Sequence, residues 1–167
     1  MTIQELNNLS DEQLKEELFK CCGSSLWGEK MMAAKPFSDM NDLLAKADRA
    51  WNSTNEKDWM EAFSHHPKIG DLKSLEKKFA STKALAGSEQ ASVHSASQKT
   101  LEQLAEGNTL YENKFGFIFI VCATGKSAEK MLAMLNDRIT NDRTNELKMA
   151  AGEQQKIIKL RLQKILS

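Results

Sequence analysis

The 167-residue sequence has no net charge and no long apolar run. Its 23 Lys and Arg residues balance its 23 Asp and Glu residues, so no basic field exists to attract nucleic acid. The longest apolar stretch, residues 115–123, falls far short of the ~20 residues that span a membrane. The first residues lack the basic and apolar blocks of a secretory signal, and the last ones are not a peroxisomal Ser-Lys-Leu address. These absences predict a cytoplasmic protein with no nucleic-acid or membrane partner.

Cysteine and histidine are scarce. The three cysteines are Cys21, Cys22 and Cys122, and an odd number with one adjacent pair suits neither a disulfide framework nor a CxxC site. We therefore expect reduced, mostly buried thiols. Only two of the three histidines are neighbours, and adjacent side chains diverge, so the sequence predicts no metal site.

The segment 122–127, CATGKS, contains part of a phosphate-binding loop. That loop also needs a glycine five positions before Gly125, where this chain has Ile120. Nor does the sequence contain the Gly-x-Ser-x-Gly elbow of a serine hydrolase. These observations argue against nucleotide binding and give no support to serine-type nucleophilic catalysis.

Helix signals fill most of the chain. Ser10 begins a capping box with Gln13 ahead of apolar residues at helical spacing. Ser38, Asn55 and Ser127 are the predicted N-caps of further helices, and a long helix is predicted over residues 143–166. Because no repeat or low-complexity linker divides the chain, we predict an all-α fold: a single compact helical domain over residues 1–167.

The apolar segment 115–123 is the exception to this pattern. By composition it could be a buried strand. One strand makes no sheet, so we expect a buried segment, either extended or helical, within a helical domain.

Glu89 falls on the apolar face of a helix predicted over residues 85–104, four residues before Val93. A carboxylate on an inward face is costly unless it is paired or functional. The alternative is an acid at a helix N-terminus, where acids are common. The pattern alone leaves both interpretations open.

Arg161 poses a similar question in the last helix. We expect Ile157, Ile158 and Ile165 to be buried, and Arg161 lies four residues from both Ile157 and Ile165. An inward arginine favours an inward anion. The alternative is an arginine whose stem covers the edge of the apolar face. Arg138 and Arg143, near helix ends, are expected to tolerate Lys.

His66 precedes Pro67 in a segment that also contains Gly70, a combination typical of a tight loop. A loop histidine that titrates near neutral pH is a credible proton donor or acceptor. The alternative is a surface histidine without a role.

Four segments together resemble the 2-oxo-4-hydroxy-4-carboxy-5-ureidoimidazoline (OHCU) decarboxylases. Residues 65–71, HHPKIGD, resemble the family's His-Pro-Arg/Lys-Ile-Gly signature, and residues 88–91, SEQA, resemble its Ser/Glu-Gln helix start. Residues 111–123, YENKFGFIFIVCA, are similar to its Tyr-x-x-x-Phe-Gly-Phe-x-Phe-Ile-x-Cys-Ala segment, and residues 160–162, LRL, also match. The resemblance covers nearly the whole chain in order.

The resemblance implies an all-α enzyme, often a homodimer, that forms (S)-allantoin from OHCU in urate degradation without a metal or organic cofactor. It implies His66 and Glu89 as catalytic residues and Arg161 as a substrate-binding residue. The other substrate-binding positions it implies are Pro67, Ala86, Gln90, Phe119, Ile120, Val121, Cys122 and Ala123.

Two departures from the family pattern bear on substrate affinity. Some members carry Arg where this chain has Thr124, and Lys126 is a candidate substitute. Ala86 stands where some members have Ser. A competing interpretation is a helical binding or regulatory module that kept the fold and lost the activity. The intact His66 and Arg161 argue against that interpretation, as does Glu89.

Overall fold

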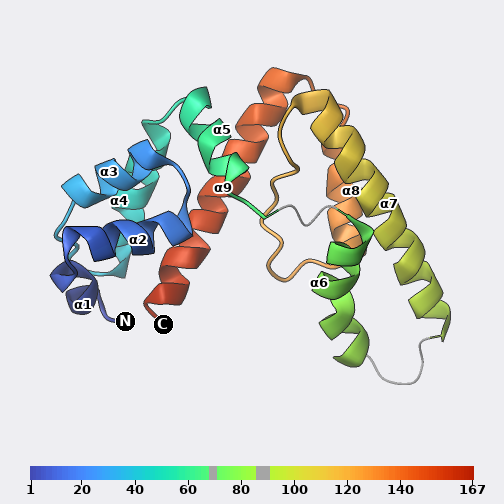
Figure 1. Ribbon diagram of the computed structural model, residues 1–167, viewed down its shortest axis with the longest axis horizontal. Coiled ribbons are helices and arrows are strands. Elements are labelled where there is room, and N and C mark those ends of the chain that lie inside the picture. Colours follow the sequence, from blue (N-terminus) through green and yellow to red (C-terminus); the bar gives the residue numbers. More distant parts are fainter. Residues whose placement is uncertain (68–70, 86–90) are drawn as a thin grey trace. The chain divides into compact units, whose positions relative to one another are not determined.

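The computed structural model describes residues 1–67, 71–85 and 91–167, with side chains described outside 80–97. These residues form nine helices and no strand (Figure 1), as predicted for an all-α fold. The helices are α1 (Ile3–Asn8), α2 (Asp11–Cys21), α3 (Ser25–Ala33), α4 (Met40–Asn52), α5 (Glu56–Ser64), α6 (Leu72–Leu85), α7 (Ala91–Phe115), α8 (Ala128–Arg138) and α9 (Arg143–Ile165).

The helices form two compact units. Unit 1 comprises residues 1–66 and 149–167, and unit 2 comprises residues 67–148. Helix α9 belongs to unit 2 up to Lys148 and to unit 1 from Met149 onward. The single domain expected over residues 1–167 stays a prediction.

Side-chain caps begin several helices where the sequence predicts them. Ser10 and Gln13 form the capping box of α2, Asn55 caps α5, and Ser127 caps α8. One prediction was wrong by one residue: Asp39, not Ser38, caps α4 by accepting from the backbone N–H of Asp42. Each cap satisfies a backbone donor that the helix itself leaves without an acceptor.

The core of unit 1 is built around α3, which packs against α2, α4 and α5. Trp27 of α3 is fully buried, and its indole N–H donates to the carbonyl of Ala47 at 3.2 Å. Trp51 of α4 is also buried and donates to the carbonyl of Ala151 at 3.0 Å. Both tryptophans therefore bury a large apolar ring without losing the hydrogen bond of its polar atom.

The buried face of α9 agrees only in part with the one expected. Ile158 is fully buried, as predicted, and so is Leu162, whereas Ile157 and Ile165 are only half-buried. The buried stripe therefore runs through Ile158 and Leu162. Gln154 interrupts it, because this polar side chain has no exposed surface.

In unit 2, α7 packs against α6 and α8. Its core cluster comprises Leu75, Leu101, Leu104, Ala128, Met131 and Leu135. After α7 ends at Phe115, Gly116 takes a positive φ of 81°, which glycine adopts without steric cost. The chain then runs without helix or strand to Ser127. The helical alternative for the apolar segment is therefore wrong beyond Phe115.

Among the described residues, no helix has both the length and the apolar character needed to cross a membrane.

Candidate active site

His66 lies just after α5 in unit 1. The helix ends at Ser64 with His65 as its C-cap, and the backbone N–H of His66 donates to the carbonyl of Phe63 at 3.2 Å. The imidazole is half-buried, and its Nε2 lies 2.5 Å from the amide oxygen of Gln154 on α9. A fixed, partly buried imidazole is a better candidate for proton transfer than a freely rotating surface histidine.

The surroundings of His66 favour its neutral form. Burial lowers its pKa below the ordinary value of 6.5, and the hydrogen bond to Gln154 acts in the opposite direction. Arg161 and His65 lower the pKa further, because a positive charge on either one disfavours a nearby imidazolium. His66 is therefore set up to accept a proton at neutral pH.

Arg161 is a residue of α9, and its guanidinium reaches the C-terminal end of α2 in the same unit. Its Nη1 donates to the carbonyls of Lys20 and Cys21, each at 3.4 Å, and the residue is half-buried. A cation is stabilised at a helix C-terminus, where carbonyls lack intrahelical donors. The side chain thus has a structural contact that the sequence did not predict, and its role toward a substrate stays a prediction.

His65, the neighbour of His66, is exposed and packs against apolar surroundings. Its ring meets that of Phe19 edge-to-face, with 4.9 Å between centroids. A Cβ added to Gly23 would come within 2.6 Å of the His65 side chain. The close approach explains why a residue without a side chain fits after α2, and it gives His65 a packing role distinct from that of His66.

The predicted substrate-binding segment lies in unit 2. Ile120 and Cys122 are buried, whereas Phe119, Val121 and Ala123 are half-buried. The Nη1 of Arg138 on α8 donates to the carbonyl of Ile120 at 2.6 Å. This contact fixes the backbone of a segment that has no helical or sheet hydrogen bonds of its own.

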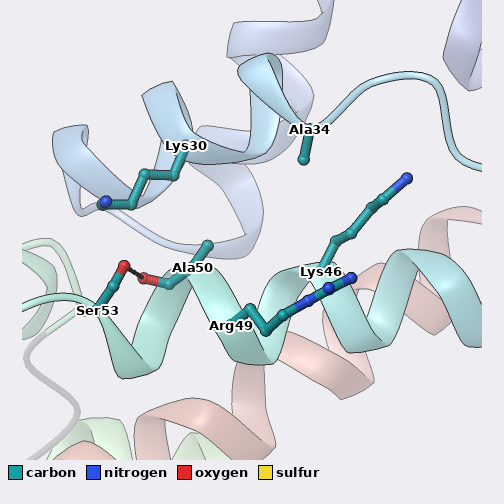
Figure 2. Close-up of a pocket in the computed structure, with 6 residues that line it drawn as sticks. All are labelled: Lys30, Ala34, Lys46, Arg49, Ala50 and Ser53. Carbon is teal, nitrogen blue, oxygen red and sulfur yellow. Dashed lines mark hydrogen bonds between the residues drawn. The ribbon is translucent and has the colours of Figure 1, made fainter.

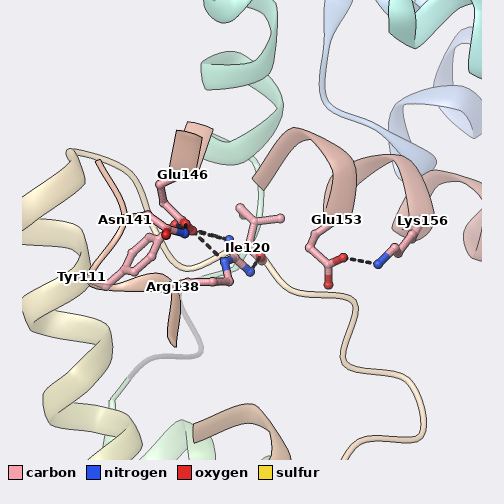
Figure 3. A network of polar contacts seen from close by, with 7 residues as sticks. All are labelled: Tyr111, Ile120, Arg138, Asn141, Glu146, Glu153 and Lys156. Carbon is pink, nitrogen blue, oxygen red and sulfur yellow. Dashed lines mark hydrogen bonds and ion pairs between the residues drawn. The ribbon is translucent and has the colours of Figure 1, made fainter. Parts of the chain in front are cut away.

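Arg138 belongs to a buried network that the sequence did not predict (Figure 3). Its guanidinium is 3% exposed and pairs at 2.6 Å with the carboxylate of Glu146, which is 0% exposed. The hydroxyl of Tyr111 and the amide of Asn141 donate to the same carboxylate. Substituting Lys would lose at least one of these contacts, so the network argues against the expected tolerance of Arg138 to Lys, which stays a prediction.

Lys126 is committed to its own loop. Its Nζ donates to the carbonyl of Cys122 at 2.6 Å, across a turn in which Gly125 takes a positive φ of 74°. The ammonium therefore closes the turn between the apolar segment and α8. Its suggested role as a substitute for the arginine of some family members stays a prediction.

The other predicted site residues lie at the edge of the described part of the chain or outside it. Pro67 follows His66 and is exposed. Ala86, Glu89 and Gln90 lie outside the described residues. The structure thus gathers His66 and Arg161 in unit 1 together with Gln154, while residues 119–123 belong to unit 2.

A separate groove lies between α3 and α4, lined by Lys30, Ala34, Lys46, Arg49, Ala50 and Ser53 (Figure 2). None of the predicted site residues lines it. Lys46 is already bound to the carboxylate of Asp42 and to the carbonyl of Pro36, both at 2.8 Å. The lining of the groove contains no carboxylate or imidazole. It therefore lacks a side chain like His66 that could accept a proton at neutral pH.

Metal-binding groups are not clustered in the part of the chain that the structure describes. Within it, no three His, Cys, Asp or Glu side chains converge on a point where an ion could be held. All three cysteines are unbridged and buried. Burial raises the pKa of both Cys21 and Cys22 to about 12, so these two thiols are protonated at neutral pH.

Comparison with known proteins gives a family match over nearly the whole chain. The family model described as OHCU decarboxylase matches residues 7–163. A crystal structure of OHCU decarboxylase in the presence of (S)-allantoin is similar with a TM-score of 0.70 and 37% identity, covering 95% of this chain and 99% of that one.

Curated relatives agree with this match. A uric acid degradation bifunctional protein of Arabidopsis thaliana is 37% identical over 92% of this chain and 47% of its own length. An OHCU decarboxylase of Haloferax volcanii is 24% identical over 97% of this chain and 94% of its own length. The chain spans less than half the length of the Arabidopsis relative and a third of a Bacillus subtilis bifunctional one.

Proposed function

The chain belongs to the OHCU decarboxylase family, and on that premise we propose that it is a carbon–carbon lyase that converts OHCU to (S)-allantoin. The observation that carries the proposal is the similarity to an OHCU decarboxylase structure over 99% of that chain. The half-buried, neutral His66 beside Gln154 supplies a proton acceptor suited to the reaction.

The chemistry requires no external electron sink. In OHCU the carboxylate is on a carbon that bears a hydroxyl and adjoins a C=N bond. When the C–C bond to CO2 breaks, its electron pair forms a C=C bond, and the C=N pair moves to nitrogen, which takes a proton. The resulting enol loses its hydroxyl proton to a base, and the adjacent carbon gains one. Because the substrate itself accepts the electrons, the protein has only to bind, orient and move protons.

We assign the hydroxyl proton to His66. Its lowered pKa keeps the imidazole neutral at pH 7, so the ring accepts this proton as the enol collapses to the carbonyl. Protonation of the neighbouring carbon on one face sets the S configuration. Glu89, in the role implied by the family resemblance, holds the ureido N–H groups and orients the ring.

Arg161 is proposed to hold the anionic or carbonyl edge of the substrate. Its Nη1 contacts with the α2 carbonyls are long, at 3.4 Å, and a guanidinium has five donors. The planar fork therefore retains donors that match a carboxylate edge. The backbone of residues 119–123, together with Pro67, Ala86 and Gln90, is proposed to complete the substrate contacts.

We further propose that the protein works in the cytoplasm as a homodimer, as the family resemblance implies. Sedimentation equilibrium of the purified chain tests the assembly, and a monomer at micromolar concentration would contradict it. A binding module that kept the fold without the activity is the competing function, and the absence of turnover would favour it.

The test generates OHCU in the cuvette and follows the optical activity of allantoin by circular dichroism. We expect accelerated formation of (S)-allantoin relative to the protein-free reaction. Chelator-dialysed protein, assayed in parallel, should be equally active. Racemic allantoin formed at the spontaneous rate would overturn the proposed function, and activity restored only by a metal would overturn its cofactor-free form.

A further inference from the structure

Gln154 is a polar residue on the core face of α9. It lies four residues after Ala150 and four before Ile158, both of them fully buried, and is itself 0% exposed. On a helix, residues four apart share a face. A Gln here gives up the apolar packing that a Leu or Met would supply, so its retention calls for a polar role.

The two ends of the Gln154 amide have different surroundings. Its oxygen lies 2.5 Å from Nε2 of His66. Its nitrogen is buried and has no hydrogen-bond partner among the described residues. A buried donor left without an acceptor costs stability. The amide is therefore placed for its contact with His66 and not for the best satisfaction of its own groups.

An amide oxygen accepts hydrogen bonds and never donates them. Opposite that oxygen, Nε2 of His66 must carry the ring proton, and a neutral imidazole then has its lone pair on Nδ1. Nδ1 has no partner among the described residues. The contact thus selects both the tautomer and the nitrogen that can act as base.

We propose that Gln154 is a positioning residue that holds His66 in the Nε2–H tautomer and so makes Nδ1 the atom that accepts the substrate's hydroxyl proton. The inference rests on the proposed decarboxylation, in which His66 is the base, and it names Nδ1 as the atom of His66 that takes the proton. Gln154 acts through His66.

The choice of an amide over a carboxylate follows from the charges around His66. Arg161 on α9 and His65 on the adjoining backbone both disfavour a positive His66. The thiols of Cys21 and Cys22, which lie close enough to Arg161 to feel its charge, are neutral. A carboxylate at position 154 would counter the effect of Arg161 and His65 and stabilise the imidazolium. A neutral amide favours the imidazolium less than a carboxylate would, so it orients the ring and leaves it able to accept a proton.

Two substitutions at position 154 should move the pH profile of kcat in opposite directions. In Gln154→Leu, the loss of the hydrogen bond that favours the imidazolium should shift the acidic limb to lower pH. The plateau should fall about 10-fold, the scale seen when an outer partner of a functional imidazole is removed. In Gln154→Glu, the carboxylate should shift the limb to higher pH.

Gln155→Leu is the matched control. Gln155 is the next residue on α9, and its amide donates at 2.9 Å to the carboxylate of Asp48, not to His66. Gln155→Leu should leave the acidic limb in place. Gln154→Leu should unfold at the same or a higher denaturant concentration than wild type, since a buried polar group is replaced by an apolar one. If the wild type is active and the acidic limb of the pH profile of kcat is unchanged in both Gln154→Leu and Gln154→Glu, the proposal is overturned.

Imidazole ¹⁵N spectra of His66 test the tautomer without reference to activity. We expect Nε2 protonated and Nδ1 unprotonated in the wild type, and a mixture of tautomers in Gln154→Leu. An Nδ1–H tautomer in the wild type would mean that the amide nitrogen faces the ring, and would overturn the inference. An inactive wild type would instead overturn the proposed function, so the two failures are distinguishable.

Discussion

At the scale of single residues, His65 and His66 have different surroundings although they are adjacent. His66 is hydrogen-bonded to Gln154, and the His65 ring packs against Phe19. We expect His66→Ala to lower kcat about 10²-fold or more, the scale of losing a general base. His65→Ala should keep most of the turnover and lose about 1 kcal/mol of unfolding free energy, because one edge-to-face aromatic contact is removed.

Steady-state kinetics and urea unfolding of the two variants provide the measurement. Equal losses of turnover in both would contradict the assignment of His66 as the base. If His66→Ala does not unfold cooperatively, its turnover does not report on the imidazole alone. His66→Gln, which keeps a polar group of similar size, is then the variant to assay.

The lowered pKa of His66 sets the direction of its pH dependence. Unfolded His66 titrates near 6.5, and folded His66 titrates at lower pH. Between these values the unfolded chain binds more protons, so the unfolding free energy falls as the pH drops below 6.5. Activity that requires neutral His66 should fall on the acidic side with a midpoint below pH 6.5. A midpoint above 6.5 would indicate a different titrating group.

How much of the site could be predicted depended on local context. His66 stands before Pro67 in a recognisable signature, and Arg161 lies in another. Gln154 belongs to no such signature. Its four-residue spacing from Ala150 and Ile158 was visible in the sequence, but its partner is 88 residues away. Periodicity shows which face a residue occupies and does not show what lies opposite that face.

At the scale of elements, Arg138 joins the segment between α7 and α8 to α8 itself. Arg138 binds both Glu146 and the carbonyl of Ile120. We expect Arg138→Met to cost about 3–5 kcal/mol of unfolding free energy, because it leaves a buried carboxylate uncompensated. Arg143→Met, at an exposed position at the start of α9, is the control and should change stability by about 0.5 kcal/mol or less.

Chemical denaturation of the two arginine variants gives these values directly. A small loss in both would show that the Arg138 pair merely offsets its own desolvation and that the apolar contacts of the segment suffice. Arg138 also lies over the ring of Phe119, 4.6 Å from its centroid, so part of the loss should appear as altered near-ultraviolet circular dichroism.

Substituting alanine at two helical glycines should change the thermal stability in opposite directions. A Cβ on Gly107 of α7 would lie 2.7 Å from the Leu135 side chain of α8, whereas one on Gly152 of α9 meets nothing within 4 Å. Alanine gains up to about 1 kcal/mol over glycine in a helix, but overpacking a core costs about 1–3 kcal/mol. We expect Gly152→Ala to raise the thermal midpoint and Gly107→Ala to lower it. Stabilisation of both would show that Leu135 repacks freely.

Helix starts were largely predictable, because a cap is a local event. Ser10, Asn55 and Ser127 each bind a backbone N–H within three residues. Where two capping residues adjoin, as Ser38 and Asp39 do, composition did not choose between them. The Arg138–Glu146 network was not predictable by the same means, since it joins residues brought together only by the packing of unit 2.

At the scale of the whole molecule, helical content and family followed from patterns spread along the chain, while the partition into units did not. Unit 1 joins the first 66 residues to the last 19. The indole of Trp51 binds a carbonyl of α9 100 residues away. No composition shift or linker marks this division, because the boundary falls within α9 and beside His66.

Because all three cysteines are buried, their alkylation measures the unfolding of the part of the chain around each of them. Cys21 and Cys22 belong to unit 1 and Cys122 to unit 2, and thiol reagents attack only an accessible thiolate. A brief pulse of iodoacetamide under mild denaturant, read by peptide mass spectrometry, should leave all three unmodified in native protein. If the chain unfolds as one domain, the three sites should become alkylated together with one midpoint. Two midpoints, one for the adjacent pair and one for Cys122, would reveal two independently melting halves.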